Sequence, residues 1–217
     1  MRHAEVHYFE GHHPHELMLT KRGREQARAA AGALDRVRFD RVITSGLPRT
    51  LETARAVAPG SEPERWPELR EIESGRLDEI PEVELEHAFT RAFHGSVAES
   101  MPFLGGETIG ALLDRVLPAL DRLVAEPGWD VALAVLHGAV NRAILSYALT
   151  GTRAFLGGIE QAPACINVID VADDWIVRGV NETPYDPAHR LSARWTTMEA
   201  LWEEFLGART GGAGSQG

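Results

Sequence analysis

The sequence predicts an α/β fold, a three-layer α/β/α sandwich around a mainly parallel sheet. Helix-like and strand-like segments alternate along the chain without an internal repeat, which is typical of α/β proteins. The uncharged apolar run 131–136 suits a strand that is buried on both faces of a parallel sheet. The length of 217 residues is compatible with one such domain.

Hydrophobic periodicity predicts the individual elements in chain order. After Thr20 as N-cap, residues 21–37 place alanines and Leu34 at helical spacing, with charged residues opposite. A strand over 41–43 and a helix over 50–57 follow. The second half predicts a helix over 107–124, the strand 131–136, a helix over 139–149 and a hairpin of strands 166–171 and 175–178.

These elements predict a single domain over residues 1–206. The acidic, helix-prone stretch 76–104 is expected to form a lid or insertion over one end of the sheet. Beyond Leu206 the chain is rich in glycine, so we expect residues 207–217 to be a disordered tail.

Composition excludes several classes of protein. The formal net charge of −10 argues against a nonspecific nucleic-acid binder, which needs a basic surface to displace phosphate counterions. No apolar run approaches the roughly 20 residues that span a bilayer, and the N-terminus lacks the layout of a secretory signal. The lone Cys165 cannot form an internal disulfide. We therefore expect a cytoplasmic protein that binds neither nucleic acid nor membrane; its oligomeric state stays open.

Two histidines occupy positions where α/β folds carry active-site residues. His137 directly follows the strand 131–136, and ligands of open α/β sheets bind at the carboxyl ends of strands. His3 stands beside Arg2 at the start of the chain. A single histidine after a strand is as often structural as functional, so neither position is decisive alone.

Short motifs in a fixed order add to this pair. They are Arg2-His3-Ala4-Glu5, Leu19-Thr20 with Gly23, Thr44-Ser45-Gly46-Leu47-Pro48-Arg49, Leu69-Arg70-Glu71 with Gly75, Gly105-Gly106-Glu107-Thr108 with Arg115, and Leu136-His137-Gly138 with Arg142. Each is weak alone, but together they resemble the histidine phosphatase superfamily, the phosphoglycerate-mutase-like proteins, over roughly residues 1–183. The resemblance implies that family's fold.

The same residues form a coherent phosphate site on chemical grounds. A phosphomonoester is a dianion, and the planar guanidinium groups of Arg2 and Arg49 match its oxygens. A protonated His137 and the backbone N–H of Gly138, at a helix N-terminus, can add donors. By resemblance, Arg2, His3, Arg49 and His137 map to the family's phosphate pocket.

His3 and Glu71 are the expected reacting groups. A neutral His3 can attack phosphorus to give a phosphohistidine. Glu71 can protonate the leaving alkoxide and later deprotonate water, and the resemblance implies the same two roles. Glu73 is a weaker rival for the acid. Glu5 and Thr20 could line the pocket, although a loop contact and a helix cap explain them more simply.

Three features depart from the family pattern. Ala4 and Ala139 stand where the family usually has glycine, so the backbone there must suit alanine. The family also precedes its Arg-His pair with a central strand, whereas only Met1 precedes Arg2 here. We therefore expect the natural protein to begin upstream with a short apolar, β-branched run.

The histidine-rich stretch near the N-terminus raises the alternative of a metal site. It contains His7, His12, His13 and His15, whose spacing follows no familiar ligand pattern. We expect a loop that faces substrate or solvent, and neither metal nor cofactor.

The predicted function is a metal-independent phosphatase that hydrolyses a small phosphorylated metabolite through a phosphohistidine. One alternative is a phosphoglycerate mutase, but mutases of the family carry a longer middle insertion and an ordered tail. The other is a non-catalytic phospho-ligand binding module, which would need neither nucleophile nor acid. The sequence does not identify the substrate.

Overall fold

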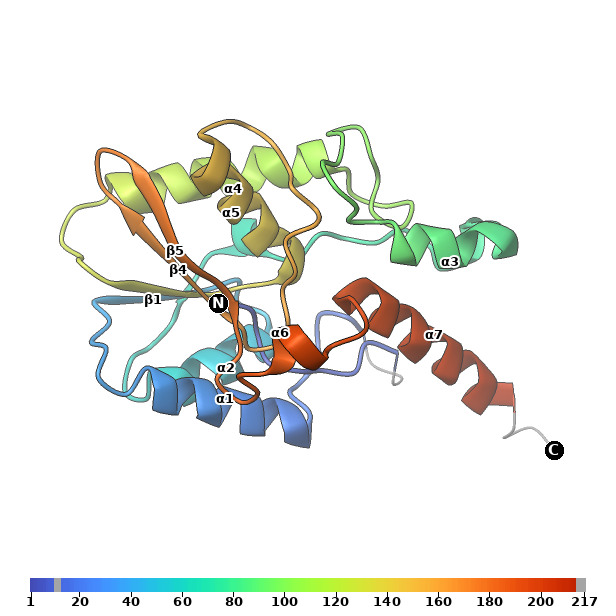
Figure 1. Ribbon diagram of the computed structural model, residues 1–217, viewed down its shortest axis with the longest axis horizontal. Coiled ribbons are helices and arrows are strands. Elements are labelled where there is room, and N and C mark those ends of the chain that lie inside the picture. Colours follow the sequence, from blue (N-terminus) through green and yellow to red (C-terminus); the bar gives the residue numbers. More distant parts are fainter. Residues whose placement is uncertain (10–12, 214–217) are drawn as a thin grey trace.

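Two helical layers cover opposite faces of a parallel sheet (Figure 1). The computed structural model describes residues 1–9 and 13–213. Its sheet has the order β2-β1-β3, with β1 (Arg41–Thr44) paired in parallel to both β2 (Glu64–Arg65) and β3 (Ala132–Val135). The predicted three-layer α/β fold is confirmed.

Alternation along the strands explains the two layers, because successive side chains of a strand point to opposite faces. Val42 and Val135 pack in one core with helices α1 (Lys21–Ala33) and α2 (Pro48–Val57). Ile43 and Leu136 pack in a second core with α4 (Ile109–Ala125) and α5 (Gly138–Thr150). The sheet is therefore buried on both faces, as the run 131–136 predicts.

The first three residues are held between β3 and the hairpin of β4 (Ile166–Val171) and β5 (Trp175–Glu182). Leu136 N–H donates to Met1 O at 2.9 Å, and His3 N–H donates to Leu136 O at 2.9 Å. On the other side, Arg2 N–H donates to Cys165 O at 3.1 Å. These bonds fix the backbone that carries Arg2 and His3. The expectation of residues upstream of Met1 stays a prediction.

Most helix boundaries lie within a few residues of those predicted. Thr20 caps α1 by accepting from Gly23 N–H at 2.9 Å, and α1 ends at Ala33 rather than at residue 37. Helix α2 begins at Pro48, since proline suits the first helical position. Segment 76–104 contains the 3₁₀ turn η2 (Leu77–Glu79) and helix α3 (Glu82–Thr90). The remaining helical elements are η1 (Pro67–Leu69), α6 (His189–Ser192) and α7 (Thr197–Ala213).

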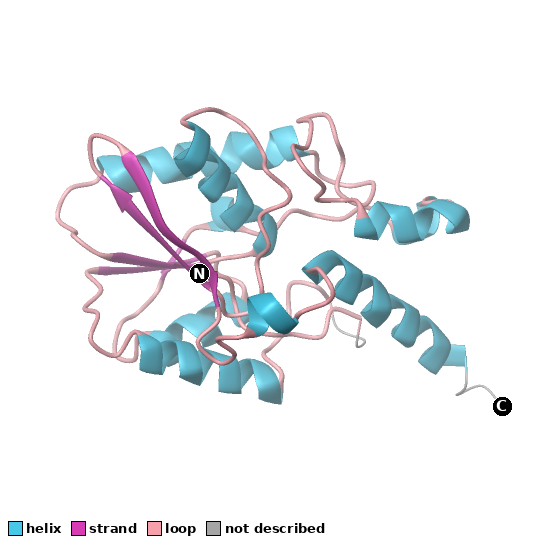
Figure 2. Ribbon diagram, viewed as in Figure 1, coloured by secondary structure: helices cyan, strands magenta, loops and turns pink. Residues whose placement is uncertain are grey.

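Helix α7 corrects one prediction: residues 207–213 are helical rather than a disordered tail. Aromatic packing overrides the glycine-rich composition here, because Phe205 stacks on Phe89 of α3 with ring centroids 5.3 Å apart. Arg209, inside the supposed tail, forms an ion pair with Glu82 at 2.7 Å. Residues 214–217 lie outside the described residues. Helices α3 and α7 lie together to one side of the sheet (Figure 2).

None of the helices in the described ranges is both long and apolar enough to cross a membrane.

Candidate active site

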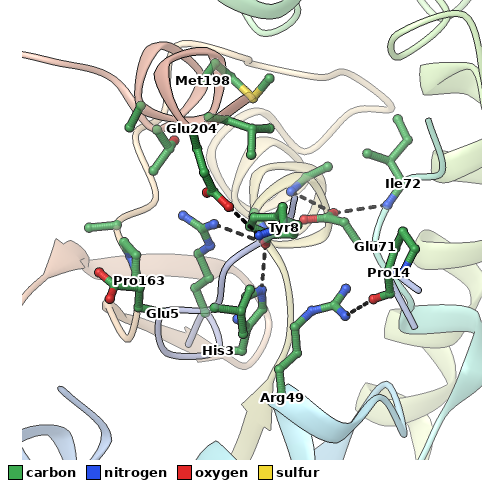
Figure 3. A pocket seen from close by; sticks show the side chains of 18 of the residues that line it. His3, Glu5, Tyr8, Pro14, Arg49, Glu71, Ile72, Pro163, Met198 and Glu204 are labelled. Atoms are coloured by element: carbon green, nitrogen blue, oxygen red, sulfur yellow. Dashed lines mark hydrogen bonds between the residues drawn. The ribbon is translucent and has the colours of Figure 1, made fainter. Parts of the chain in front are cut away.

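The predicted site residues come together around one cavity of about 920 Å³ (Figure 3). Residues that line it include Arg2, His3, Arg49, Glu71 and Gly138. They come from the N-terminal segment, the start of α2, the loop after η1 and the start of α5. His137 lies beside them, completely buried, with its ring centroid 5.2 Å from that of His3.

His3 presents one ring nitrogen to the cavity as a base. Its Nδ1 lies 2.7 Å from Ala4 O, and because a carbonyl oxygen can only accept, Nδ1 carries the proton and Nε2 keeps its lone pair. Burial lowers the pKa of His3 well below its usual value, and the charges of Arg49 and Arg2 lower it further. His3 is therefore neutral near pH 7, as a nucleophile requires.

Three buried side-chain nitrogens nearby, two of them guanidinium donors, have no partner within the part of the chain that the structure describes. They are Arg2 Nε, Arg49 Nε and His137 Nδ1. One outer nitrogen of each guanidinium group is fixed by a backbone carbonyl: Arg2 Nη1 donates to Gln161 O at 2.6 Å and Arg49 Nη1 to Pro14 O at 2.8 Å. Buried donors without partners are rare and costly. Their convergence indicates a site for an anion.

His137 is oriented by Ser45, which stood in the predicted motif order without a role. Its Nε2 lies 2.7 Å from Ser45 Oγ, in the loop after β1. Burial lowers the pKa of His137 well below its usual value, helped by Arg49 and by His3. His137 is thus neutral in this state of the site, and the protonated form considered from the sequence would need the negative charge of a bound phosphate.

Burial of both histidines predicts that acid destabilises the fold. Their pKa values are lowered in the folded state, so below about pH 6.5 the unfolded chain binds more protons. The free energy of unfolding should fall by up to about 1.4 kcal/mol per pH unit for each histidine. The amino group of Met1, whose pKa burial lowers to about 6, acts in the same direction between about pH 8 and 6.

Urea unfolding of the wild type and of His3→Asn between pH 5 and 7.5 measures this effect. The variant should lose about half of the slope below pH 6.5. Identical slopes for the two proteins would contradict the prediction.

Glu71 faces the same cavity, and its carboxylate accepts hydrogen bonds from backbone N–H groups at the start of α5. Its Oε2 accepts from Gly138 N–H at 2.9 Å, and its Oε1 accepts from Ala139 N–H and Ile72 N–H, both at 3.1 Å. In this arrangement the Gly138 N–H holds Glu71, whereas the sequence analysis assigned that group to phosphate. Glu71 is therefore positioned rigidly beside the anion site.

Arg115 supports the loop that carries Glu71. Its Nη1 donates to Glu68 O at 2.7 Å and to Arg70 O at 2.6 Å, and its Nη2 donates to Glu71 O at 3.2 Å. Glu107 holds the same guanidinium group at 2.8 Å. Arg115 stood in the predicted motif order without a role; its contacts join segments more than forty positions apart, which no local pattern reveals.

Tyr8 is a residue that the sequence analysis missed. Its hydroxyl lies 3.2 Å from His3 Nε2 and 3.5 Å from Arg2 Nη2, at the centre of the cavity (Figure 3). Tyr8 stands next to His7 in the histidine-rich stretch and belongs to none of the quoted motifs. Because Nε2 has no proton, the phenol donates to it, and a reacting phosphorus atom would have to displace this hydroxyl.

The remaining candidates take minor positions. Glu73 also lines the cavity, but its side chain is 68% exposed and, among the described residues, contacts only His15, at 4.0 Å, whereas Glu71 is held at the start of α5. Thr20 is a helix cap that also donates to Glu5 Oε1 at 2.9 Å, and Glu5 lines the cavity. Ala4 is not among the positive-φ residues of the described chain, which explains how alanine fits there.

The histidine-rich stretch forms no metal cluster within the described residues, where no three potential ligands converge. His13 and His15 pack edge to face, with ring centroids 5.0 Å apart. His12 lies outside the described residues, so the alternative of a metal site is tested only in part.

Residues 1–183 match the family model of the histidine phosphatase superfamily (branch 1). The chain belongs to this superfamily. The adenosylcobalamin/alpha-ribazole phosphatase of Salmonella typhimurium is 28% identical over 170 residues, which are 76% of this chain and 83% of that protein. The 6-phosphofructo-2-kinase/fructose-2,6-bisphosphatase of Gallus gallus is 30% identical over 135 residues, 60% of this chain but only 28% of that protein.

Solved structures of this superfamily share the fold. The alpha-ribazole phosphatase of Shigella flexneri superimposes with a TM-score of 0.68 at 25% identity, covering 83% of this chain and 94% of that one. A mycobacterial glucosyl-3-phosphoglycerate phosphatase also gives a TM-score of 0.68, at 22% identity, covering 85% of this chain and 96% of its own. The second comparison concerns the fold alone.

Proposed function

We propose that this histidine phosphatase superfamily member is a phosphomonoesterase that hydrolyses a small phosphorylated metabolite through a phosphohistidine, without a metal ion. The observation that carries the proposal is the unprotonated Nε2 of His3 beside three buried nitrogens without partners in the described chain, Arg2 Nε, Arg49 Nε and His137 Nδ1. A phosphate dianion supplies acceptors for the two guanidinium donors. The names of the relatives, several of which are phosphatases, support this reaction class.

The proposed reaction has two displacements. His3 Nε2 attacks phosphorus, the bond from phosphorus to the ester oxygen breaks, and Glu71 gives its proton to the departing alkoxide. Glu71, now ionised, takes a proton from a water molecule that attacks the phosphohistidine. The nitrogen–phosphorus bond then breaks, which releases phosphate and restores neutral His3 and protonated Glu71. Arg2, Arg49 and His137 hold the phosphoryl oxygens throughout.

Phosphoryl transfer by a mutase is the main alternative, and the expected disordered tail no longer counts against it. The glycine-rich tail suggested an open site, yet α7 is ordered and Met198, Leu201 and Glu204 of this helix line the cavity. Hydrolysis is favoured by the extended match to the Salmonella typhimurium phosphatase. A binding module is disfavoured because phosphate binding alone requires neither the unprotonated Nε2 of His3 nor Glu71.

We also propose that the protein works in the cytoplasm, without nucleic-acid or membrane partners. The acidic net charge of −10 and the single, buried Cys165 support this location.

A phosphatase screen in EDTA tests the proposed function. Phosphosugars, phosphoglycerates, nucleotides and phosphopeptides are incubated with protein after prolonged EDTA treatment, and released phosphate is measured. We expect hydrolysis of at least one metabolite class at a rate within about twofold of the untreated protein, because no ion supplies a Lewis acid or activated water. Activity that EDTA abolishes and zinc or magnesium restores would favour the histidine-rich stretch as a metal site instead.

Removing the Tyr8 hydroxyl should strengthen the binding of phosphate. A buried hydrogen bond contributes about 0.5–1.5 kcal/mol net, so loss of the bond to His3 Nε2 should lower the inhibition constant of inorganic phosphate about two- to tenfold in Tyr8→Phe. Tyr147→Phe, at a tyrosine outside the cavity lining, is the matched control. Weaker phosphate binding in Tyr8→Phe would show instead that the hydroxyl donates to the bound anion.

A further inference from the structure

The cavity extends from the anion site to an apolar wall. Figure 3 shows Met198 and Glu204 of α7 on the opposite side of the cavity from His3 and Arg49. The apolar side chains of this wall come from the N-terminal segment, segment 77–104 and α7. They are Phe9, Leu77, Phe89, Phe93, Phe103, Leu104, Met198 and Leu201. We call the space beside them the α3–α7 compartment.

The whole cavity is too large for the phosphoryl group alone. A volume of about 920 Å³ falls in the range of roughly 300–1,000 Å³ typical of pockets for whole organic ligands. Such pockets combine apolar walls with a few polar groups that fix orientation. Here His3 and Arg49 lie at one end of the cavity, the apolar side chains named above belong to the core between α3 and α7, and Glu204 of α7 adds a carboxylate beside them. Trp195, which also lines the cavity, is 65% exposed.

Hydrogen bonds hold α7, the helix that forms part of the wall, in place. Glu204 Oε1 accepts from the backbone N–H of Phe9 at 3.2 Å and also from that of Tyr8. At the other end of the helix, Thr197 Oγ1 donates to Glu160 Oε1 at 2.6 Å. These bonds tie α7 to the segment that carries the nucleophile and to the loop before β4. The compartment is therefore formed before a ligand arrives, which lowers the entropic cost of binding.

We propose that the α3–α7 compartment binds the alcohol portion of the substrate, and that this portion is a bulky apolar or aromatic group. This inference rests on the proposed function and adds the substrate class to it. The phosphoryl group reaches Arg2, Arg49 and His3, while the organic group contacts the partly exposed side chains of the wall, which include Leu201, Phe93 and Phe103. A small polyhydroxylated alcohol would gain little from these apolar side chains.

A series of primary alkyl phosphates tests the proposal in the full chain. Ethyl, butyl, hexyl and 2-phenylethyl phosphate all release an alkoxide, so their chemical steps are similar; glycerol 3-phosphate is a polar counterpart of the butyl ester. Burial of a methylene is worth about 0.8 kcal/mol, which corresponds to about fourfold in kcat/KM. We expect kcat/KM to rise on the order of 10²-fold from ethyl to hexyl phosphate, and glycerol 3-phosphate to be poorer than butyl phosphate.

A substitution in the apolar wall tests whether the dependence of kcat/KM on chain length arises there. Leu201→Asn, which keeps the number and branching of the side-chain heavy atoms, should reduce the hexyl-to-ethyl ratio of kcat/KM by about tenfold or more, since the polar amide disfavours the apolar chain. Leu206→Asn makes the same substitution on the same helix at a residue that does not line the cavity. It should keep the wild-type ratio.

Phosphonate binding separates this proposal from the proposed function, because it needs no turnover. By calorimetry, hexylphosphonate should bind wild-type protein on the order of 10³-fold more tightly than methylphosphonate, and Leu201→Asn should lose most of the difference. Equal affinities, or equal kcat/KM along the ester series, would overturn the compartment's role. A clear phosphonate preference with no hydrolysis of any ester would support the compartment and reject the phosphatase.

Discussion

His3→Ala should lose turnover by at least about 10⁴-fold, the largest effect expected in this protein. His3 Nε2 is the only reacting atom that can form the covalent intermediate in the proposed reaction, and Arg2 and Arg49 can bind phosphate but cannot replace a nucleophile. Brief incubation with ³²P-labelled substrate should label the wild type through an acid-labile, base-stable bond. His3→Ala should stay unlabelled.

Two controls separate loss of the nucleophile from loss of the fold. His94→Ala removes an exposed histidine outside the cavity lining and should keep both label and rate. His3 is 1% exposed, so its replacement leaves a void; His3→Asn fills more of it and should be equally inactive while unfolding cooperatively. Label that survives in either His3 variant would place the phosphoryl group on another residue.

The sequence predicts the parts of this fold that rest on local periodicity. The uncharged run 131–136 becomes β3, buried on both faces, and the apolar stripe of 107–124 becomes α4 with Thr108 as its cap. His137 and Arg49 reach the site because the carboxyl ends of parallel strands share one edge of the sheet. The order of the motifs adds His3 and Glu71 to the predicted site. Neither residue follows a predicted strand, so strand positions alone do not indicate them.

The sequence did not reveal features that depend on contacts between distant segments. Ser45 orients His137 across the β1–β3 pair, and Arg115 supports the Glu71 loop from α4. Neither contact leaves a local pattern. The tail was predicted wrongly for a related reason: glycine composition favours disorder, but Phe205 and Trp202 pack on Phe89, and this packing outweighs local propensity through Ala213.

Glu71→Gln should lower kcat/KM about 10²–10⁴-fold for alkyl phosphates, the usual size of general acid catalysis. The amide cannot donate a carboxyl proton to the leaving alkoxide. It also has one oxygen where the carboxylate accepts from Gly138, Ala139 and Ile72, so the loop will shift slightly and activity will fall for this reason too. A comparison of leaving groups on the same variant separates the two causes.

Aryl phosphates supply that comparison, because a phenolate needs little protonation to depart. In Glu71→Gln, 4-nitrophenyl phosphate should phosphorylate His3 nearly as fast as in the wild type, and stopped-flow absorbance should show a burst of nitrophenolate. Slow steady turnover should follow the burst, since hydrolysis of the phosphohistidine still requires a base to take a proton from water. Glu73→Gln, two residues along the same loop and exposed, is the matched control and should behave like the wild type. Equal losses on alkyl and aryl esters in the phosphorylation step, or a larger loss in Glu73→Gln, would assign the proton transfer to another group.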